Sequence, residues 1–528
     1  MLISATRLIL LSAVFLSLSG NWRFMSAAAE AFPPGQGNIL FLMSIPVVHA
    51  SVLVLLLVMF SNRFLLRPVL TLLFLLAAGA AYFSDRFGAV IDDTMILNVL
   101  QTDPAEARDL VTLEWLVRMV LLALVPIALL WRAKIDKVPL RRAWRSRLLL
   151  GGGALATAVL TILVFGSSYA SFFREFKPVR YYANPTYPLY SLGRFISGEQ
   201  GVGTPVDVRN IDERAHLPAH DGDRELMILV IGETARADHF SLNGYERDTN
   251  PVLSSIPGVY SYASVTACGT STAVSVPCIF SQIQHDDFDV ADASGQENAL
   301  DVLQRVGVSV LWRDNNSSSK GVATRVEYQD FRSAQLNPVC DEECRDVGML
   351  AGLQEYVDAQ DGDVLVVLHQ MGNHGPAYFR RYPEAFEFFS PVCKTVKLSE
   401  CTEEEVVNAY DNAIRYTDWF LGEVINFLRK NESRYETMML YVSDHGESLG
   451  EYGVYLHGAP YAFAPEAQVS VPLVVWQGAH NDIDEESLAL KQYRPTSHDS
   501  IYPTLLDFFE VQDASVDVNR LLFIRNDA

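Results

Sequence analysis

Long apolar segments dominate the first third of this 528-residue chain and constrain its fold more than any other feature. Each segment approaches the ~20 residues that a helix needs to cross the hydrocarbon layer of a membrane. Because backbone polar groups must be paired within the chain in that layer, segments of this kind are expected to be helical. The sequence therefore predicts five membrane-spanning helices, at residues 5–28, 38–60, 66–83, 113–131 and 148–165.

Basic residues are distributed unevenly between the loops that join these segments. The loop from 84 to 112 carries only Arg86 and Arg108, whereas the shorter loop before the fifth segment carries seven basic residues. Loops rich in lysine and arginine stay in the cytoplasm, so the chain after the fifth segment is predicted to lie outside it. The first segment also has features of a cleavable signal peptide, but its removal would not change this orientation. The seven residues are Arg132, Lys134, Lys137, Arg141, Arg142, Arg145 and Arg147.

Past residue 170 the apolar segments end and the sequence becomes mixed. We predict a transmembrane domain at 1–170, an irregular linker along the membrane surface at 171–222, and a soluble domain at 223–528. Strand-like apolar runs alternate in the soluble domain with helical patterns such as 406–429, which favours an α/β fold with a largely parallel sheet. The predicted strands are 226–231, 308–312, 364–368, 437–443 and 471–476.

All six cysteines lie in the predicted soluble domain and form three close pairs. An even, clustered set of cysteines on the outer side of a membrane is typical of disulfides. A zinc-binding or redox-active set is the alternative that the spacing leaves open. The predicted bridges are Cys268–Cys278, Cys340–Cys344 and Cys393–Cys401.

Acidic and imidazole side chains follow two of the predicted strands. Asp444 and His445 come directly after strand 437–443, and Glu233 comes shortly after strand 226–231. Ligands of open α/β sheets gather beyond the carboxyl ends of the strands, so we expect these three side chains to converge. Two carboxylates and one imidazole suit zinc and leave a fourth position open, as in a catalytic zinc site.

A hydroxyl-rich stretch between the first two predicted strands offers a nucleophile. A helix is predicted to begin near Thr272, and its free amides and dipole would favour an anionic oxygen or a phosphate there. From this stretch alone, an ordinary threonine N-cap beside a disulfide is the alternative. A cation bound by the three predicted ligands would activate an alcohol, which makes Thr272 the candidate nucleophile.

These motifs together resemble those of the lipid A phosphoethanolamine transferases, the family that includes the colistin-resistance enzymes. The resemblance covers nearly the whole chain, including the five spans. It implies an N-terminal bundle of five transmembrane helices and a C-terminal α/β domain of the alkaline phosphatase and sulfatase superfamily. The motifs are Glu233-Thr-Ala-Arg236, Cys268-Gly-Thr-Ser-Thr-Ala273, Trp312-Arg-Asp-Asn-Asn316 with Lys320, Gly372-Asn-His-Gly-Pro376, Ser443-Asp-His-Gly-Glu447 and Leu456-His-Gly458.

The resemblance also implies roles for single residues. Thr272 would carry the phosphoethanolamine group, and His374 and His457 would bind phosphate, protonate the leaving group or hold a second zinc ion. Asn316 and Lys320 are expected to stabilise charge on the phosphoryl oxygens. His369 is expected to have only a structural role. The implied ligands of the catalytic zinc ion are Glu233, Thr272, Asp444 and His445.

The implied reaction transfers phosphoethanolamine from phosphatidylethanolamine to a lipid A phosphate and gives polymyxin and colistin resistance. The protein would be a multi-pass monomer of the bacterial inner membrane, with its catalytic domain in the periplasm and no nucleic-acid partner. Asn98, Thr102 and Glu106 have helical spacing and are expected to meet the ethanolamine head group. A polar helix face at the water boundary is the alternative for these three residues.

Three other functions can be compared with these motifs: those of a sulfatase, a related transferase and a sensor. A sulfatase would have proline two places and arginine four places after its nucleophile, whereas Thr272 is followed by Val274 and Val276. Transfer of phosphoethanolamine or phosphoglycerol to lipopolysaccharide core sugars or to glucans remains the main alternative. A metal-stabilised sensor without turnover is less consistent with a hydroxyl group beside an open metal site.

Overall fold

The computed structural model describes residues 2–62, 64–102, 107–108, 110–136, 138–174, 176–196, 208–218 and 224–526. The chain divides into two compact units. The helical unit comprises Met1–Ile96 and Val111–Ser197, and the sheet unit comprises Leu97–Leu110 and Gly198–Ala528.

Four spans in the described part of the helical unit are long and apolar enough to cross a membrane. A bent pair of helices, α1 (Ala5–Leu18) and α2 (Trp22–Ala31), makes a fifth span if the two count as one; they meet at 59°. Gly20 lies at the bend with φ of +71°, and a Cβ there would lie 2.9 Å from Ala81 Cβ, so close packing and a left-handed turn both require glycine. The predicted helical bundle is confirmed, and its first segment is bent. The four spans are α3 (Ile39–Met59), α4 (Leu66–Phe87), the continuous helix α7-η2-α8 (Leu113–Met119, Val120–Leu124 and Val125–Arg132), and α9 (Leu140–Val164).

Part of the segment predicted to be an irregular linker is helical. The end of α10 (Gly166–Arg174), the 3-10 helix η3 (Lys177–Tyr182) and α11 (Thr186–Ile196) all fall in it. The expectation of irregular structure is therefore wrong over these residues. Pro178 and Pro188 lie in the first turns of their helices, where a missing backbone N–H costs nothing.

The described residues of the sheet unit build an eight-stranded sheet in the order β12-β4-β11-β8-β3-β7-β5-β6. The run from β8 to β6 is parallel throughout, β12 is parallel to β4, and β11 is antiparallel to both of its neighbours. The five predicted strands and the largely parallel sheet are confirmed. The strands are β3 (Glu225–Gly232), β4 (Val259–Thr266), β5 (Ser309–Asp314), β6 (Glu327–Asp330), β7 (Val364–His369), β8 (Glu436–Ser443), β11 (Ser470–Gln477) and β12 (Thr496–Ser497).

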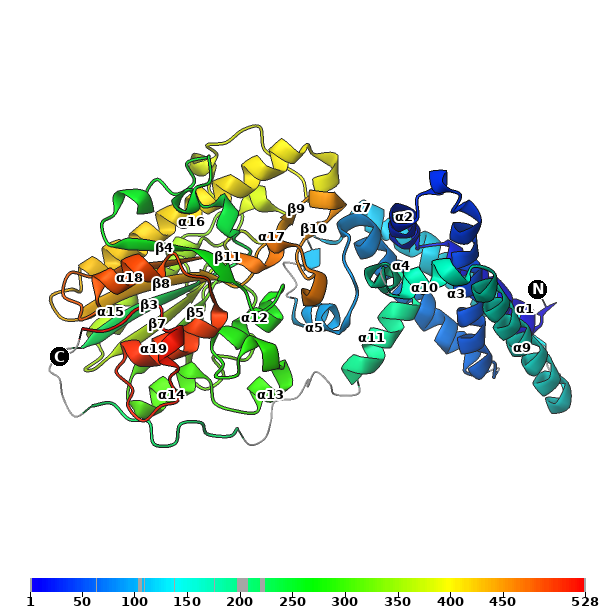
Figure 1. Cartoon of the computed structure of the whole chain (residues 1–528), viewed down its shortest axis with the longest axis horizontal. Helices are drawn as coiled ribbons and strands as arrows, with labels where there is room; N and C mark the ends of the chain where they lie inside the picture. The colour runs from blue at the N-terminus through cyan, green and yellow to red at the C-terminus, as the bar shows by residue number, and fades with distance from the viewer. Residues whose placement is uncertain are drawn as a thin grey trace. The chain divides into compact units, whose positions relative to one another are not determined.

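Helices cover both faces of the sheet (Figure 1). Alternate residues of β3 point to opposite faces, as the period of two in a strand requires. One set packs in a core with α14 (Ala299–Val306) and α19 (Ile501–Phe508), and the other packs with the long helix α16 (Glu403–Arg429). Burial on both faces explains why the central strands are continuously apolar.

The three predicted disulfides, Cys268–Cys278, Cys340–Cys344 and Cys393–Cys401, are confirmed. They account for all six cysteines, which excludes the alternative of a cysteine zinc site. The first bridge encloses the start of α12 (Thr272–Ile279), where the candidate nucleophile lies.

Candidate metal centre

Loops that follow neighbouring parallel strands bring polar side chains to one edge of the sheet. Glu233 follows β3, and Asp444 and His445 follow β8, which pairs with β3 along its whole length. The loop after β5 carries Asn316, and the loop after β7 carries His374. The loops after the carboxyl ends of these strands therefore form the candidate site, where ligands of open α/β sheets gather.

Glu233, Asp444 and His445 form a group whose ligand atoms all lie within 4.8 Å of one another. His445 Nε2 lies 3.6 Å from Glu233 Oε1 and 3.3 Å from Asp444 Oδ2. Both carboxylate oxygens are buried and have no hydrogen-bond partner among the described residues. Because a buried carboxylate is costly without a partner, this donor set fits a bound cation.

Thr272 completes the group. Its Oγ1 donates a hydrogen bond to Glu233 Oε2 at 3.2 Å and lies 3.4 Å from His445 Nε2. Ser271 holds the N-cap position of α12 and Thr272 is the first helical residue, so the interpretation of Thr272 as an ordinary N-cap is wrong. The hydroxyl group faces the candidate metal ligands and not the amides of its own helix.

Burial sets the protonation of these groups. It raises the pKa of Asp444 to about 6 and raises the pKa of Glu233, which the nearby Asp444 carboxylate raises further. Burial also lowers the pKa of His445, so its imidazole is neutral near pH 7 and can donate its lone pair to a metal. A divalent cation would offset the cost of the two buried carboxylates.

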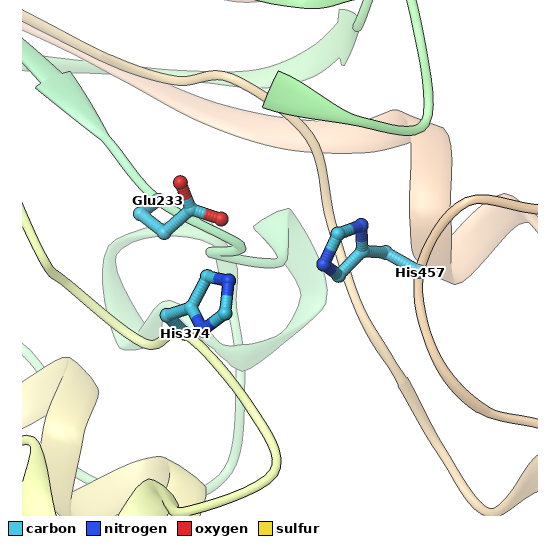
Figure 2. Close-up of side chains that lie close together, drawn as sticks. All are labelled: Glu233, His374 and His457. Atoms are coloured by element: carbon cyan, nitrogen blue, oxygen red, sulfur yellow. The ribbon is translucent and has the colours of Figure 1, made fainter. Parts of the chain in front are cut away.

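His374 and His457 lie beside this group, and Figure 2 shows them facing a common space with Glu233. Their ligand atoms and that of Glu233 again lie within 4.8 Å of one another. The His374 and His457 ring centres are 5.9 Å apart, and the His457 ring centre is 4.2 Å from that of His445. Glu233 is therefore shared between two overlapping groups of potential ligands.

Asn316 and Lys320 come from the segment that follows β5. Asn316 Nδ2 donates to Glu233 Oε2 at 2.6 Å and to Gln370 O at 2.7 Å, so this amide orients the carboxylate. Lys320 has φ of +49°, and its Nζ lies 3.5 Å from Gln101 O. The positive charge of Lys320 also contributes to lowering the pKa of His457, after burial and the neighbouring histidines.

The residues predicted to meet the donor head group lie around the end of α5 (Asp93–Gln101). Asn98 is within the helix and Thr102 follows it, with Thr102 Oγ1 donating to Asn98 O at 2.8 Å. Glu106 lies outside the described residues. Both described residues belong to the sheet unit, and their contact with a lipid head group remains a prediction.

Two further buried groups lie next to the site: Asp346, which sequence reasoning did not single out, and His369, for which it expected a structural role. Asp346 accepts hydrogen bonds from the amides of Met371 and Gly372 and so orders the loop that carries His374. His369 lies 3.1 Å from Asp314 through Nδ1, and its charge lowers the pKa of Asp444 against the effect of burial. The position of His369 at the end of a strand was a signal, whereas nothing in the sequence around Asp346 links it to the site.

Known proteins match both units of the chain. Residues 49–199 match the family "Phosphoethanolamine transferase EptA/EptB", and residues 225–511 match the family "Sulfatase". Phosphatidylethanolamine transferase Mcr-2 of Escherichia coli is 44% identical over 98% of this chain and 96% of its own length. Phosphoethanolamine transferase EptA of Escherichia coli strain K12 is 38% identical over 96% of this chain and 94% of its own.

Solved structures agree with these matches. The integral membrane protein lipooligosaccharide phosphoethanolamine transferase A (EptA) from Neisseria meningitidis matches with a TM-score of 0.95 and 32% identity over 100% of both chains. The soluble domain of the Neisseria meningitidis enzyme has a TM-score of 0.59 and 38% identity, covering 61% of this chain and 99% of that one. The resemblance inferred from the motifs is confirmed. The chain is therefore an enzyme that belongs to the phosphoethanolamine transferase family.

Proposed function

We propose that this enzyme transfers phosphoethanolamine from phosphatidylethanolamine to a phosphate of lipid A, through a covalent intermediate on Thr272, and so gives resistance to polymyxins such as colistin. The observation that carries the proposal is the approach of the Thr272 hydroxyl to Glu233 and His445. The name of the relative Mcr-2, a phosphatidylethanolamine transferase, supports the donor. The Neisseria relative is named for lipooligosaccharide, which supports a membrane glycolipid acceptor.

Glu233, Asp444, His445 and Thr272 would hold one zinc ion. Two carboxylate oxygens that accept no hydrogen bond from the described residues, together with a neutral imidazole, match the ligands that zinc prefers, and they leave a place for the alcohol oxygen. A bound zinc ion would lower the pKa of the alcohol and neutralise charge on the phosphoryl oxygens. Glu233, His374 and His457 would hold a second ion if one is needed.

The first step exchanges one phosphorus–oxygen bond for another. The Thr272 hydroxyl passes its proton to Glu233 Oε2, to which it donates a hydrogen bond, and Oγ1 forms a bond to the phosphorus of phosphatidylethanolamine as the bond to the diacylglycerol oxygen breaks. That oxygen takes up a proton from His374 or His457 as it leaves. Lys320 and the amides at the start of α12 would stabilise the charge that develops on the phosphoryl oxygens.

The second step returns Thr272 to its starting state. The lipid A phosphate gives its proton to the same histidine, and its oxygen forms a bond to the phosphorus as the bond from phosphorus to Thr272 Oγ1 breaks. Oγ1 then takes its proton back from Glu233. Asn98, Thr102 and Glu106 would hold the ethanolamine head group of the donor. Both substrates are membrane lipids, which suits a monomeric, multi-pass inner-membrane protein with the catalytic domain 223–528 in the periplasm.

Mass spectrometry of lipid A tests the proposal. Cells that produce the wild-type protein should gain one phosphoethanolamine unit on lipid A and survive higher colistin concentrations, whereas cells with no protein should do neither. Unchanged lipid A together with modified core sugars or glucans would identify the alternative acceptors and contradict the proposal.

A further inference from the structure

The turn that carries Glu233 has a strained backbone. Thr234, the next residue, has φ of +51°, which is the left-handed region. A β-branched residue is crowded in that region, so the surrounding structure must hold it there. Thr234 is fully buried, and its Oγ1 has no hydrogen-bond partner in the described part of the chain, so its side chain does not supply this hold.

Side chains from other parts of the chain accept hydrogen bonds from the backbone amides of three successive residues of this turn, 234–236. One acceptor is Ser443, the last residue of β8, the second is Asp444, which directly follows β8, and the third is Tyr410 on α16. The strained turn is thus tied to two elements that are distant in sequence. The bonds are Thr234 N to Asp444 Oδ1 at 3.2 Å, Ala235 N to Ser443 Oγ at 2.8 Å, and Arg236 N to Tyr410 Oη at 3.0 Å.

Of these three acceptors, only Tyr410 forms hydrogen bonds with both the first and the last residue of the turn. Its Oη accepts from Arg236 N and donates to Thr234 O at 2.6 Å. The side chain is fully buried, and burial raises the pKa of Tyr410 well above its usual value, so the hydroxyl keeps its proton and can do both. Its ring packs edge-on against Tyr378 and His239, which fixes its place independently of the hydroxyl.

The backbone of Tyr410 reaches the neighbouring loop as well. Asn373 Nδ2 donates to Tyr410 O at 3.1 Å, and Asn373 N donates to Glu233 O at 3.0 Å. Asn373 directly precedes His374. One position on α16 therefore contacts both the turn after Glu233 and the loop of His374.

We propose that Tyr410 is a positioning residue. Its hydroxyl fixes the backbone conformation of the turn after Glu233 and so orients the Glu233 carboxylate toward Asp444 and His445. The inference rests on the metal site in the proposed function. Without the hydroxyl, Thr234 O and Arg236 N lose their buried partner, and Thr234 is free to relax toward an ordinary φ. The Glu233 carboxylate is then less well placed before a metal binds.

Tyr410→Phe in the purified full-length protein tests this role, because the substitution removes the hydroxyl and keeps the ring. We expect the zinc dissociation constant to rise about 10-fold, as for the loss of other groups that orient metal ligands. In the metal-free protein, amide hydrogen exchange in the segment 234–238 should become faster.

The matched control is Tyr262→Phe. Tyr262 lies on β4, is also buried, and donates to Leu522 O at the same distance of 2.6 Å, and among the described residues no hydrogen bond or ring contact joins its side chain to the site. The control should lose a similar amount of thermal stability and keep the zinc affinity and the exchange rates of segment 234–238.

The outcomes separate the two proposals. Wild-type protein that binds no zinc would contradict the proposed metal site, and the exchange measurement on metal-free protein would still decide the role of Tyr410. Wild-type zinc affinity and unchanged exchange in Tyr410→Phe would overturn the inference. An equal loss of zinc affinity in Tyr262→Phe would also overturn it, because the effect would then be general destabilisation.

Discussion

At Thr272 the hydroxyl group contacts Glu233 and His445, so removal of this one oxygen should abolish the reaction and leave the fold intact. We expect Thr272→Ala to be folded, to bind zinc more weakly and to transfer nothing, because no atom can carry the phosphoryl group. Intact-mass measurement should show a phosphoethanolamine adduct on the wild-type protein and none on the variant. Transfer at the wild-type rate by Thr272→Ala would remove this residue from the mechanism.

Asn316 holds Glu233 by a hydrogen bond of 2.6 Å, so its loss should weaken metal binding. We expect Asn316→Ala to lower zinc affinity and transfer rate by about 10- to 100-fold. A suitable control is Asn431→Ala, because Asn431 Nδ2 likewise donates to a side-chain oxygen, of Gln354, and to a backbone carbonyl, of Phe427, outside the site. A chelator-competition assay measures both variants, and equal zinc affinities would contradict the assigned role of Asn316.

Among the elements, the long helix α16 forms hydrogen bonds both with the turn after Glu233 and with a segment outside the site. Near its middle, Asp418 accepts hydrogen bonds from the amides of Val252 and Leu253, at the start of the 3-10 helix η6 (Leu253–Ser255). Burial raises the pKa of Asp418 to about 7 from the value of 3.8 that it has when exposed. The folded protein therefore binds this proton more tightly than the unfolded chain does.

This raised pKa predicts how stability depends on pH. The contribution of Asp418 is fully present below about pH 4 and is lost as pH rises to about 7, with a slope of up to about 1.4 kcal/mol per pH unit. We expect Asp418→Asn to remove this part of the slope in unfolding experiments between pH 4.5 and about 7.5. The exposed Glu342, with 77% of its side chain accessible, provides the control Glu342→Gln. Parallel pH profiles for wild type and Asp418→Asn would refute the expectation.

A strand can be recognised from the sequence when all of its residues are buried, because it then appears as a continuous apolar run. Every residue of β3 and β7 is buried, so their apolar runs are visible in the sequence. The edge strand β6 is polar and partly exposed, and β12 has two residues, so neither leaves an apolar run. In the predicted linker, the prolines lie in first helical turns, where proline is compatible with a helix, so a proline-rich composition does not exclude helices there.

For the whole molecule, the distribution of basic residues predicts that the sheet unit lies outside the cytoplasm. All native cysteines are in disulfides, so a single introduced cysteine provides the only free thiol. A membrane-impermeant thiol reagent should label Ser255→Cys, in the sheet unit, in cells with a permeable outer membrane. It should label the exposed position of Val138→Cys, in the basic loop, only after the inner membrane is opened. The reverse pattern would overturn the predicted orientation.

The sequence by itself determined the membrane segments, the central strands and which residues are candidate ligands, because apolar length and motif composition are local properties of the chain. Only the tertiary structure decided that Thr272 and Glu233, separated by 39 residues, come into contact. It also decided that Asn316 turns toward Glu233 and that Tyr410 braces the strained turn after it. The physical reason is that the order of parallel strands in the sheet, and not their order in the chain, sets which loops meet at its edge.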